Sequence, residues 1–304
     1  MPKALINGIN IHYQIRGQGP NLVLIHGATG NMAFWYLSSL AALEKKFRVI
    51  LYDLRGHGYS DCPPTGYSSG QMAADLRGLL DYLEIERTHL IGHSFGGVTA
   101  LHTTVLFPER VESLVLADPE IPVLRSLCSM EQWPFWDSWK EQLRELGIDM
   151  PDEKWDDMDY MLRQCIYIPM AHGLRKGKKR LGKRILRLLD DTTAVRDFRE
   201  IDGLTQERIM QVRQPTLAMY GELSPFLPVC SFLSENMPNC KSIIVPTGHL
   251  HPGLEPEIFY DTVSRFLFDP EHFKSEEQKE HITAFNATSR SAIESVLNRP
   301  NVHI

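Results

Sequence analysis

The sequence predicts an α/β protein built on a mostly parallel sheet with helices on both faces. Short apolar runs, typical of buried strands, alternate with stretches of helical spacing over residues 21–117 and again after residue 215. From 119 to 213 no run reads well as a buried parallel strand, and helix formers and tryptophan are frequent. We therefore expect a helical insertion over the carboxyl ends of the strands, where such sheets bind ligands.

The composition is that of an ordinary globular protein with enough chain for a large core. The 304 residues are 43% hydrophobic and 23% charged, with a formal net charge of -6. This balance gives no reason to expect nucleic acid as a partner. The chain has no signal-peptide-like start and no run of about 20 apolar residues, and its five scattered cysteines indicate reduced thiols. We expect a cytoplasmic protein without a transmembrane segment, a metal or another cofactor.

The first element expected is a β-hairpin, because Asn7-Gly8 is a strong two-residue turn signal between the apolar residues 4–6 and 9–13. Later strands are expected where continuous apolar runs end at glycine, proline or polar residues. Those strands are 21–25, 47–52, 88–91, 111–117, 216–220 and 241–245. Helices are expected where apolar residues recur at helical spacing. They cover residues 34–46, 71–83, 95–107, 229–236 and 257–268.

A Gly-x-Ser-x-Gly pattern at Gly92, Ser94 and Gly96 connects the expected strand 88–91 to the helix after it. Such a turn strains the serine backbone and needs glycines, because side chains would collide where the helix passes close to the strand. The strain holds the Ser94 hydroxyl where a base and a substrate carbonyl can both reach it. The N–H of Phe95 then lies at a helix N-terminus, where it is suited to stabilise an oxyanion.

With these motifs in view, the chain resembles the α/β-hydrolase fold with a helical cap. The matching stretches are His26-Gly27, Asp53-x-Arg55-Gly56-x-Gly58-x-Ser60, residues 92–97, Gly248-His249 and Pro256-Glu257-x-Phe259. The resemblance implies a core formed by 1–118 and 214–304, in which 269–304 is a helical tail, and a cap formed by 119–213. It implies hydrolytic machinery of the serine type and says little about the substrate.

The resemblance also implies a catalytic triad in the chain order serine, acid, histidine. His249, in a turn after the last expected strand, matches the late histidine of the family and is the expected general base. His251, two residues further on, is its competitor. The second N–H of the oxyanion hole is expected from Ala28, in the turn after strand 21–25, with Thr29 as the neighbouring alternative.

The acid is where this chain departs from the common pattern of the family. Many relatives carry aspartate at the position of Ser224, and a serine hydroxyl cannot supply the charge that an imidazolium needs. A second location known in the fold is the end of the strand after the nucleophile helix, where Asp118 lies. We expect Asp118 to be the acid, with Glu222 and then Glu120 as the alternatives.

Aromatic residues of the expected cap, Trp133, Trp136 and Trp139, recur at a spacing of three and can share a helix face. They would either line an apolar substrate pocket above the nucleophile or join the cap to the core. The basic run 175–187 is either a solvated face or a contact for an anionic carrier, a cofactor tail or a membrane surface. The tail 269–304 is expected to pack on the core, to form a homo-oligomer or to be partly disordered.

The leading hypothesis is a serine hydrolase that cleaves a carboxylic ester or thioester, free or bound to an acyl carrier, through an acyl-enzyme on Ser94. C–C bond hydrolysis, or a lyase or cyclase reaction on the same scaffold, stays open because a fold alone does not fix the reaction. The serine argues against dehalogenase and epoxide-hydrolase chemistry, which need a carboxylate nucleophile at this turn. The alternative outside enzymes is a ligand receptor that retains the triad.

Overall fold

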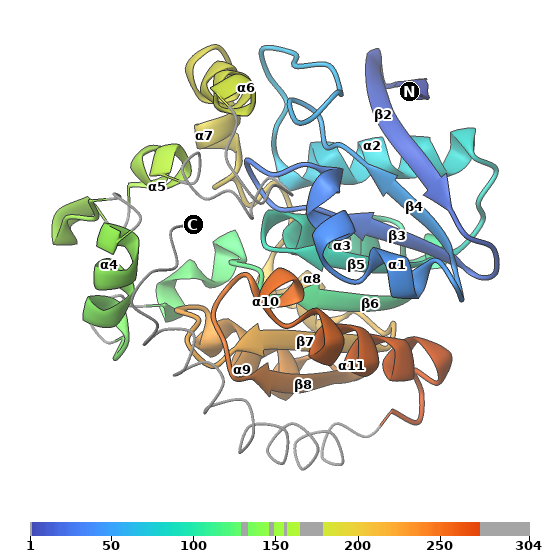
Figure 1. Cartoon of the computed structure of the whole chain (residues 1–304). Coiled ribbons are helices and arrows are strands. Elements are labelled where there is room, and N and C mark those ends of the chain that lie inside the picture. The colour runs from blue at the N-terminus through green and yellow to red at the C-terminus, as the bar shows by residue number, and fades with distance from the viewer. Residues whose placement is uncertain (1, 129–132, 146–148, 155–156, 165–178, 274–304) are drawn as a thin grey trace.

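The computed structural model describes residues 2–128, 133–145, 149–154, 157–164 and 179–273. At its centre is an eight-stranded sheet with the order β1-β2-β4-β3-β5-β6-β7-β8 (Figure 1). The strands are β1 (Lys3–Ile6), β2 (Ile9–Arg16), β3 (Asn21–Ile25), β4 (Arg48–Tyr52), β5 (Thr88–His93), β6 (Val111–Ala117), β7 (Thr216–Gly221) and β8 (Cys240–Val245). β2 pairs antiparallel with β1 and with β4, and every later pairing is parallel. The predicted fold class is confirmed.

The predicted hairpin is the first unit of the sheet. Asn7 and Gly8 have φ values of 48° and 80°, the left-handed conformation that a two-residue hairpin turn requires at both positions. Ile6 pairs with Ile9 across the turn, so the register follows directly from the turn residues.

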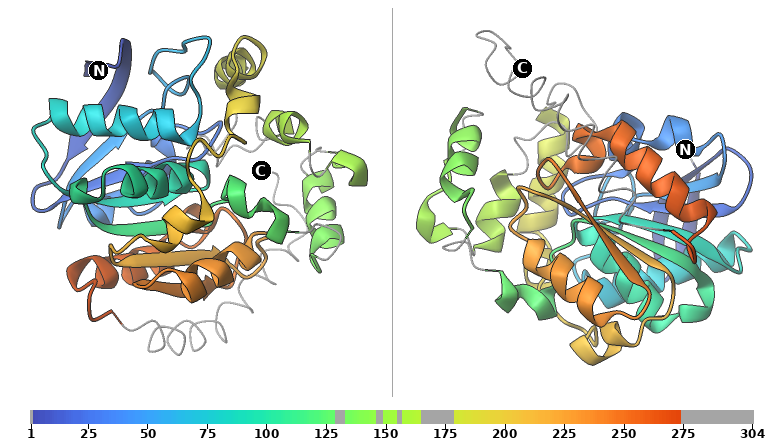
Figure 2. Two further views of the ribbon diagram at one scale, coloured as in Figure 1. Left: turned by 180° about the vertical axis from the view of Figure 1, so that it is seen from behind. Right: turned by 90° about the horizontal axis from the view of Figure 1, so that it is seen from below.

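Helices cover both faces of the sheet, because successive side chains of each buried strand point to opposite faces. In β4, Ile50 and Tyr52 join the core under one helix layer, and Val49 and Leu51 join the core under the other. The first layer contains α2 (Ser69–Tyr82), α3 (Phe95–Leu106) and α9 (Leu227–Asn236), and the second contains α1 (Leu40–Leu43) and α11 (Pro256–Phe268) (Figure 2). The other helical segments are η1 (Met32–Leu37), η2 (Pro108–Arg110), η3 (Pro122–Leu127), α4 (Trp136–Glu145), η5 (Asp152–Lys154), α5 (Met158–Gln164), α6 (Lys179–Asp190), α7 (Ala194–Asp197), α8 (Gln206–Met210) and α10 (His251–Leu254).

The single helix predicted over 34–46 is wrong, because this stretch is divided between η1 and α1. The N–H of Met32 donates to Asp53 Oδ1 at 2.9 Å, and the Asn31 side chain accepts from the Ala33 N–H, so helical structure begins earlier than expected. Ser38 then leaves the helical conformation, with φ -110° and ψ -118°, and ends the 3₁₀ turn. The short polar side chain of Ser38 donates to the Trp35 carbonyl, a bond that competes with helix continuation.

Between β6 and β7 the chain forms η3 and the helices α4 to α8 and contributes no strand among its described residues. α4, α5 and α6 lie beyond the edge of the sheet toward which the parallel strands point (Figure 1). Since parallel strands gather their carboxyl ends at one edge, this segment faces the turns that follow β3, β5 and β6.

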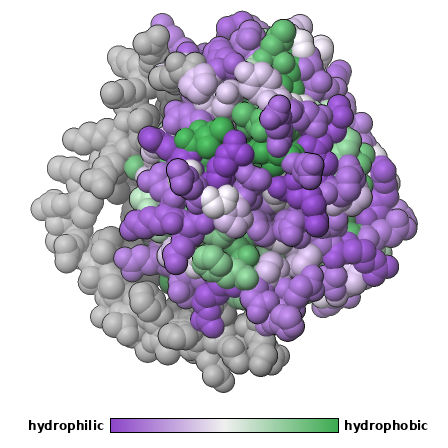
Figure 3. Space-filling model, turned by 90° about the vertical axis from the view of Figure 1, so that its right-hand side faces the viewer, coloured by the Kyte–Doolittle hydropathy of each residue, from purple (hydrophilic) through white to green (hydrophobic). Residues whose placement is uncertain are grey.

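The opposite side of the molecule is mainly hydrophilic, with apolar side chains in small separate groups, as expected of a solvent-facing surface (Figure 3). Among the described residues, no helix is both long and apolar enough to cross a membrane. The described chain ends at Phe273, which is buried and packs edge-on against Phe266 with ring centroids 5.5 Å apart. The rest of the predicted tail, 274–304, lies outside the described residues.

Candidate active site

The turn between β5 and α3 has the strained geometry that its glycine pattern predicts. Ser94 has φ 54° and ψ -126°, a conformation that an L-residue adopts only when its surroundings enforce it. A Cβ on Gly92 would lie 2.2 Å from the Gly96 carbonyl oxygen, and one on Gly96 would lie 2.3 Å from the Ile25 carbonyl oxygen. Only glycine fits these close approaches, which place half-buried Ser94 at the start of a 12-residue helix.

The residue that follows β6, Asp118, lies beside the late histidine. Its Oδ1 is 3.1 Å from Nδ1 of His249, and the carboxylate is fully buried, whereas the His249 side chain is 32% exposed. The Gly221 N–H donates to Asp118 Oδ2 at 2.8 Å, and the Ser224 hydroxyl donates to Oδ1 at 2.5 Å. These donors satisfy the buried carboxylate and fix its plane with one oxygen toward the imidazole.

The other acids that the sequence offered lie in different surroundings. Glu120 forms an ion pair with Arg125, and Glu222 is half-buried in the turn after β7, where its N–H donates to the Val245 carbonyl. The Ser224 hydroxyl, which carries no charge, serves as a hydrogen-bond donor to Asp118. Among the described carboxylates, Asp118 is the one in hydrogen-bond contact with Nδ1 of the histidine.

The two competing histidines have different environments. His251 is fully buried, its Nε2 donates to the Met219 carbonyl at 3.1 Å, and burial lowers its pKa to about 4. It is therefore a neutral packing residue beneath the site. His249 is partly exposed, with one ring nitrogen directed at Asp118, so its geometry is the one that a general base needs.

His93 has a contact that the sequence did not reveal. Its Nε2 donates to the backbone carbonyl of His249 at 2.9 Å, and its ring stacks on Phe34 with centroids 4.8 Å apart. Burial lowers the pKa of His93 well below its usual value, and the neighbouring His249 ring acts in the same direction. Phe226 packs edge-on against His249 at 5.5 Å. The turn that carries His249 is thus contacted by His93 and Phe226, which belong to other parts of the chain.

The turn after β3 passes directly beside the nucleophile candidate. A Cβ on Gly27 would lie 3.0 Å from Cβ of Ser94. The Thr29 N–H, the alternative oxyanion donor, donates to Nε2 of His57 at 3.1 Å, so it is already used. The N–H of Ala28 is therefore the better candidate from this turn.

Trp133 and Trp136, in the segment between β6 and β7, contact other residues of that segment. Trp133 precedes α4, so the expectation that all three tryptophans share a helix face is wrong. The Trp136 ring lies 6.3 Å from that of Trp133, and its Nε1 donates to Asp152 at 2.7 Å. The side chain of Trp139 lies outside the described residues.

Part of the basic run 175–187 also lies outside the described residues, which resume at Lys179. Within α6, the Arg184 guanidinium donates to the Gly58 carbonyl and lies over the Tyr59 ring, 4.6 Å from its centroid. At least this cation of the run binds the loop after β4 and does not simply face solvent.

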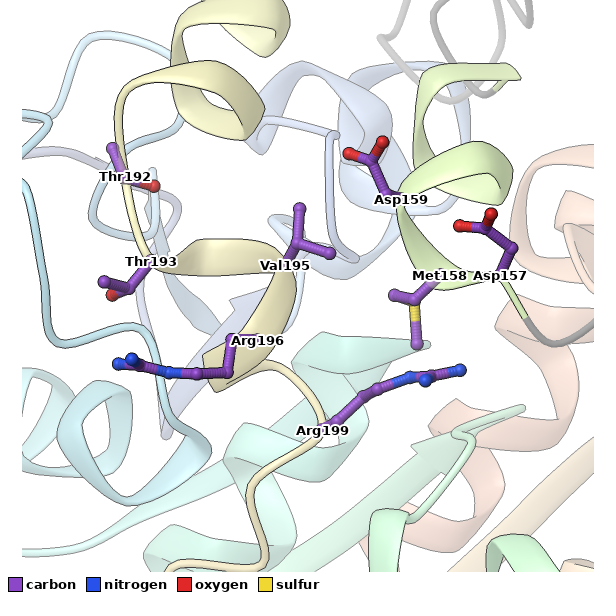
Figure 4. Close-up of a pocket in the computed structure, with 8 residues that line it drawn as sticks. All are labelled: Asp157, Met158, Asp159, Thr192, Thr193, Val195, Arg196 and Arg199. Atoms are coloured by element: carbon purple, nitrogen blue, oxygen red, sulfur yellow. The ribbon is translucent and has the colours of Figure 1, made fainter.

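An open pocket of about 650 Å³ lies between α5 and the segment around α7 (Figure 4). Asp157 and Asp159 contribute carboxylates from the α5 side, and the side chains of Arg196 and Arg199 extend in opposite directions from the other side. Phe198, next to this wall, packs on Phe95 with ring centroids 4.5 Å apart. The contact between Phe198 and Phe95 thus connects the wall of this pocket to the turn that carries Ser94.

Comparison with known proteins agrees with this architecture. Residues 20–147 match the family model of the alpha/beta hydrolase fold. The chain is 43% identical to the "Putative carbamate hydrolase RutD" of Stutzerimonas stutzeri (strain A1501), over 78% of this chain and 89% of that relative. It is also 27% identical to the "Putative 2-succinyl-6-hydroxy-2,4-cyclohexadiene-1-carboxylate synthase" of Bacillus subtilis (strain 168), over 84% of this chain and 95% of that relative. The chain belongs to the alpha/beta hydrolase fold family.

Solved structures share the fold at low sequence identity. The enol-lactonase from Burkholderia xenovorans LB400 superposes with a TM-score of 0.61 at 22% identity, covering 88% of this chain and 100% of that chain. The esterase from Exiguobacterium antarcticum superposes with a TM-score of 0.62 at 23% identity, covering 87% and 98%. At this level of identity the likeness extends to the fold and not to the reaction.

Proposed function

We propose that the protein is a serine hydrolase that cleaves a carboxylic ester or thioester through an acyl-enzyme on Ser94. The observation that carries the proposal is the 3.1 Å contact between Asp118 Oδ1 and His249 Nδ1. The His249 ring lies 5.0 Å from the ring of His93, the residue before the strained Ser94. A carboxylate at Nδ1 fixes the tautomer whose Nε2 accepts a proton and stabilises the imidazolium that forms.

In this mechanism the Ser94 hydroxyl loses its proton to His249 Nε2 as its oxygen attacks the substrate carbonyl. The N–H groups of Phe95 and Ala28 stabilise the negative charge on the carbonyl oxygen. Collapse of the tetrahedral intermediate transfers the proton to the leaving alcohol or thiol. Water, activated by the same histidine, then releases the acid and regenerates Ser94.

The segment 119–213 acts as a cap over a core formed by 1–118 and 214–304. The position of α4 to α6 beyond the carboxyl edge of the sheet supports this division (Figure 1). The small-molecule substrate would enter between cap and core, where Phe198 contacts Phe95. A carbamate is included among the substrate classes because the relative at 43% identity is named as a putative carbamate hydrolase, and its hydrolysis uses the same attack on a carbonyl.

The test is a panel of p-nitrophenyl esters, acyl thioesters and carbamates, run with the wild-type protein and with Ser94→Ala. Reaction of Ser94 with a fluorophosphonate probe is measured by intact mass in parallel. Turnover that the variant loses, together with labelling at Ser94, is the expected result. Labelling followed by a single slow turnover would favour a receptor, and no labelling of Ser94 would exclude both readings. Cleavage of a C–C substrate with no activity on esters would move the reaction to the C–C hydrolase alternative.

A further inference from the structure

Two histidines tie the turn after β3 to the loop after β4, the neighbouring parallel strand. His26, in the first of these turns, accepts the Leu54 N–H at Nε2 over 3.1 Å. His57, in the second, accepts the Thr29 N–H at Nε2, also over 3.1 Å. Both rings are buried, and their centroids are 5.2 Å apart. Each segment thus supplies an imidazole acceptor for a backbone N–H of the other.

The tautomer of both rings follows from their second contacts. Nδ1 of His26 lies 2.8 Å from the Gly27 carbonyl oxygen, and Nδ1 of His57 lies 2.8 Å from the Arg55 carbonyl oxygen. A carbonyl oxygen can only accept, so Nδ1 carries the proton in each ring and Nε2 is the acceptor. Burial lowers the pKa of His26 below its usual value, which agrees with a neutral ring there.

The bond to His57 acts on the most strained residue of the oxyanion turn. Thr29 has φ 61°, in the left-handed region that β-branched residues avoid. The peptide group between Ala28 and Thr29 therefore needs a hydrogen bond from outside the turn to keep its orientation. The buried Nε2 of His57 supplies this bond by accepting the Thr29 N–H. Without it the turn would relax, and the Ala28 N–H would change direction. That turn lies against the nucleophile, since a Cβ on Gly27 would be 3.0 Å from Cβ of Ser94.

We propose that His57 is a positioning residue for the reaction. By accepting the Thr29 N–H it fixes the turn so that the Ala28 N–H points to the oxyanion. This inference rests on the proposed function, because the direction of that N–H matters only when Ser94 attacks a carbonyl.

Two substitutions of His57 by amide residues distinguish the effects of its two hydrogen bonds, to the Thr29 N–H and to the Arg55 carbonyl. In His57→Gln the side-chain oxygen reaches the place of Nε2, so it can accept the Thr29 N–H. In His57→Asn the shorter amide can still donate to the Arg55 carbonyl but does not reach Thr29. Loss of one oxyanion donor costs about 10²- to 10³-fold in kcat, so we expect His57→Asn to lose about 10²-fold with KM changed less than about threefold. His57→Gln should stay within about fivefold of wild type, because the acceptor is restored.

His89→Asn is the matched control for the cost of losing a buried imidazole. His89 is also a buried histidine, and it bonds Ser113 Oγ at 2.8 Å from the other end of β5. This variant should lower the melting temperature as His57→Asn does and leave kcat unchanged. Equal kcat for the two His57 variants, or a kcat for His57→Asn within about twofold of wild type, would overturn the inference.

Hydrogen exchange of the Thr29 amide gives a readout that does not depend on activity. We expect this amide to be protected in wild type and in His57→Gln, and to exchange faster in His57→Asn. Unchanged protection of the Thr29 amide in His57→Asn would overturn this inference and leave the proposed function standing. A wild-type protein that reacts with no substrate of the panel and no fluorophosphonate would instead overturn the proposed function, and the catalytic part of this inference with it.

Discussion

Replacing Asp118 by asparagine removes the charge opposite His249 while keeping the size of the side chain. The imidazolium that forms during the reaction would lie next to the carboxylate, with Oδ1 and Nδ1 3.1 Å apart. Two unit charges about 4 Å apart at an effective dielectric constant of about 20 interact by about 4 kcal/mol. At about 1.4 kcal/mol for each tenfold change in rate, this corresponds to a loss of about 10³-fold in kcat.

Hydrogen bonding increases the expected loss. Both carboxylate oxygens accept in the wild type, one from Gly221 and the other from Ser224 and His249. An asparagine amide presents only one acceptor, so its NH₂ must face either the Gly221 N–H or the histidine side. The second orientation also favours the wrong imidazole tautomer, an effect that costs about 10⁴-fold in other triads. We therefore expect a decrease of about 10³- to 10⁴-fold in kcat on the best ester.

The assay is steady-state hydrolysis with the folded fraction checked by circular dichroism, and Glu222→Gln is the matched control. KM should change little, because the lost interaction forms only in the transition state. The reasoning is refuted if Asp118→Asn keeps more than about a tenth of kcat while Glu222→Gln loses several orders of magnitude. A second variant, Asp118→Asn with Ser224→Asp, should recover part of the activity, because residue 224 already contacts Asp118 Oδ1.

Four further outcomes are expected. Ser94→Ala should lose acyl transfer by several orders of magnitude with the melting temperature nearly unchanged, and retention of a tenth of the activity would exclude Ser94 as nucleophile. Ser224→Ala should cost about 1–3 kcal/mol of unfolding free energy but less than about tenfold in kcat, because Asp118 keeps its charge and its bond from Gly221. Trp136→Ala should lower the melting temperature without changing chain-length preference, because its contacts include Trp133 and Asp152 of the same segment, and a changed preference in the ester panel would place it at the substrate instead. The pKa of His251 is lowered from its usual value of 6.5 to about 4 in the folded protein. At a pH between these two values, His251 is protonated in the unfolded chain and neutral in the folded chain. Stability is then lost as pH falls through this window, by about 1.4 kcal/mol per pH unit, and His251→Gln should flatten that slope in denaturant titrations.

The strands could be predicted from the sequence because each is a continuous apolar run that ends at a turn residue. β3 (Asn21–Ile25) and β6 (Val111–Ala117) have the predicted bounds. The stretch 34–46 was predicted wrongly because its conformation depends on Asp53, which lies 21 residues from Met32 in the chain. Local helical spacing contains no information about such a distant acceptor.

The candidate site likewise contains features that the local sequence predicts and contacts between distant segments that it does not. The strained turn at Ser94 follows from the spacing of its glycines, and Asp118 was singled out because its strand was expected beside the nucleophile strand, as β5 and β6 are. The roles of these residues stay predictions. The contacts of His93 with the His249 carbonyl and of His57 with Thr29 could not be predicted, because they join segments 156 and 28 residues apart through side chains that also suit ordinary packing.

The place of Asp118 at the end of β6 also divides the proposed machinery unevenly along the polypeptide. The first 118 residues contain the nucleophile, both oxyanion donors and the acid, and the base alone lies beyond residue 214. If the chain is expressed as two fragments separated within 119–213, neither fragment holds a complete triad. Hydrolysis would then appear only when β6 and β7 pair and bring His249 to Asp118. If each fragment were fused to one of two interacting proteins, their association would restore ester hydrolysis. That hydrolysis would report the association, because the triad is completed by the pairing of one strand with another.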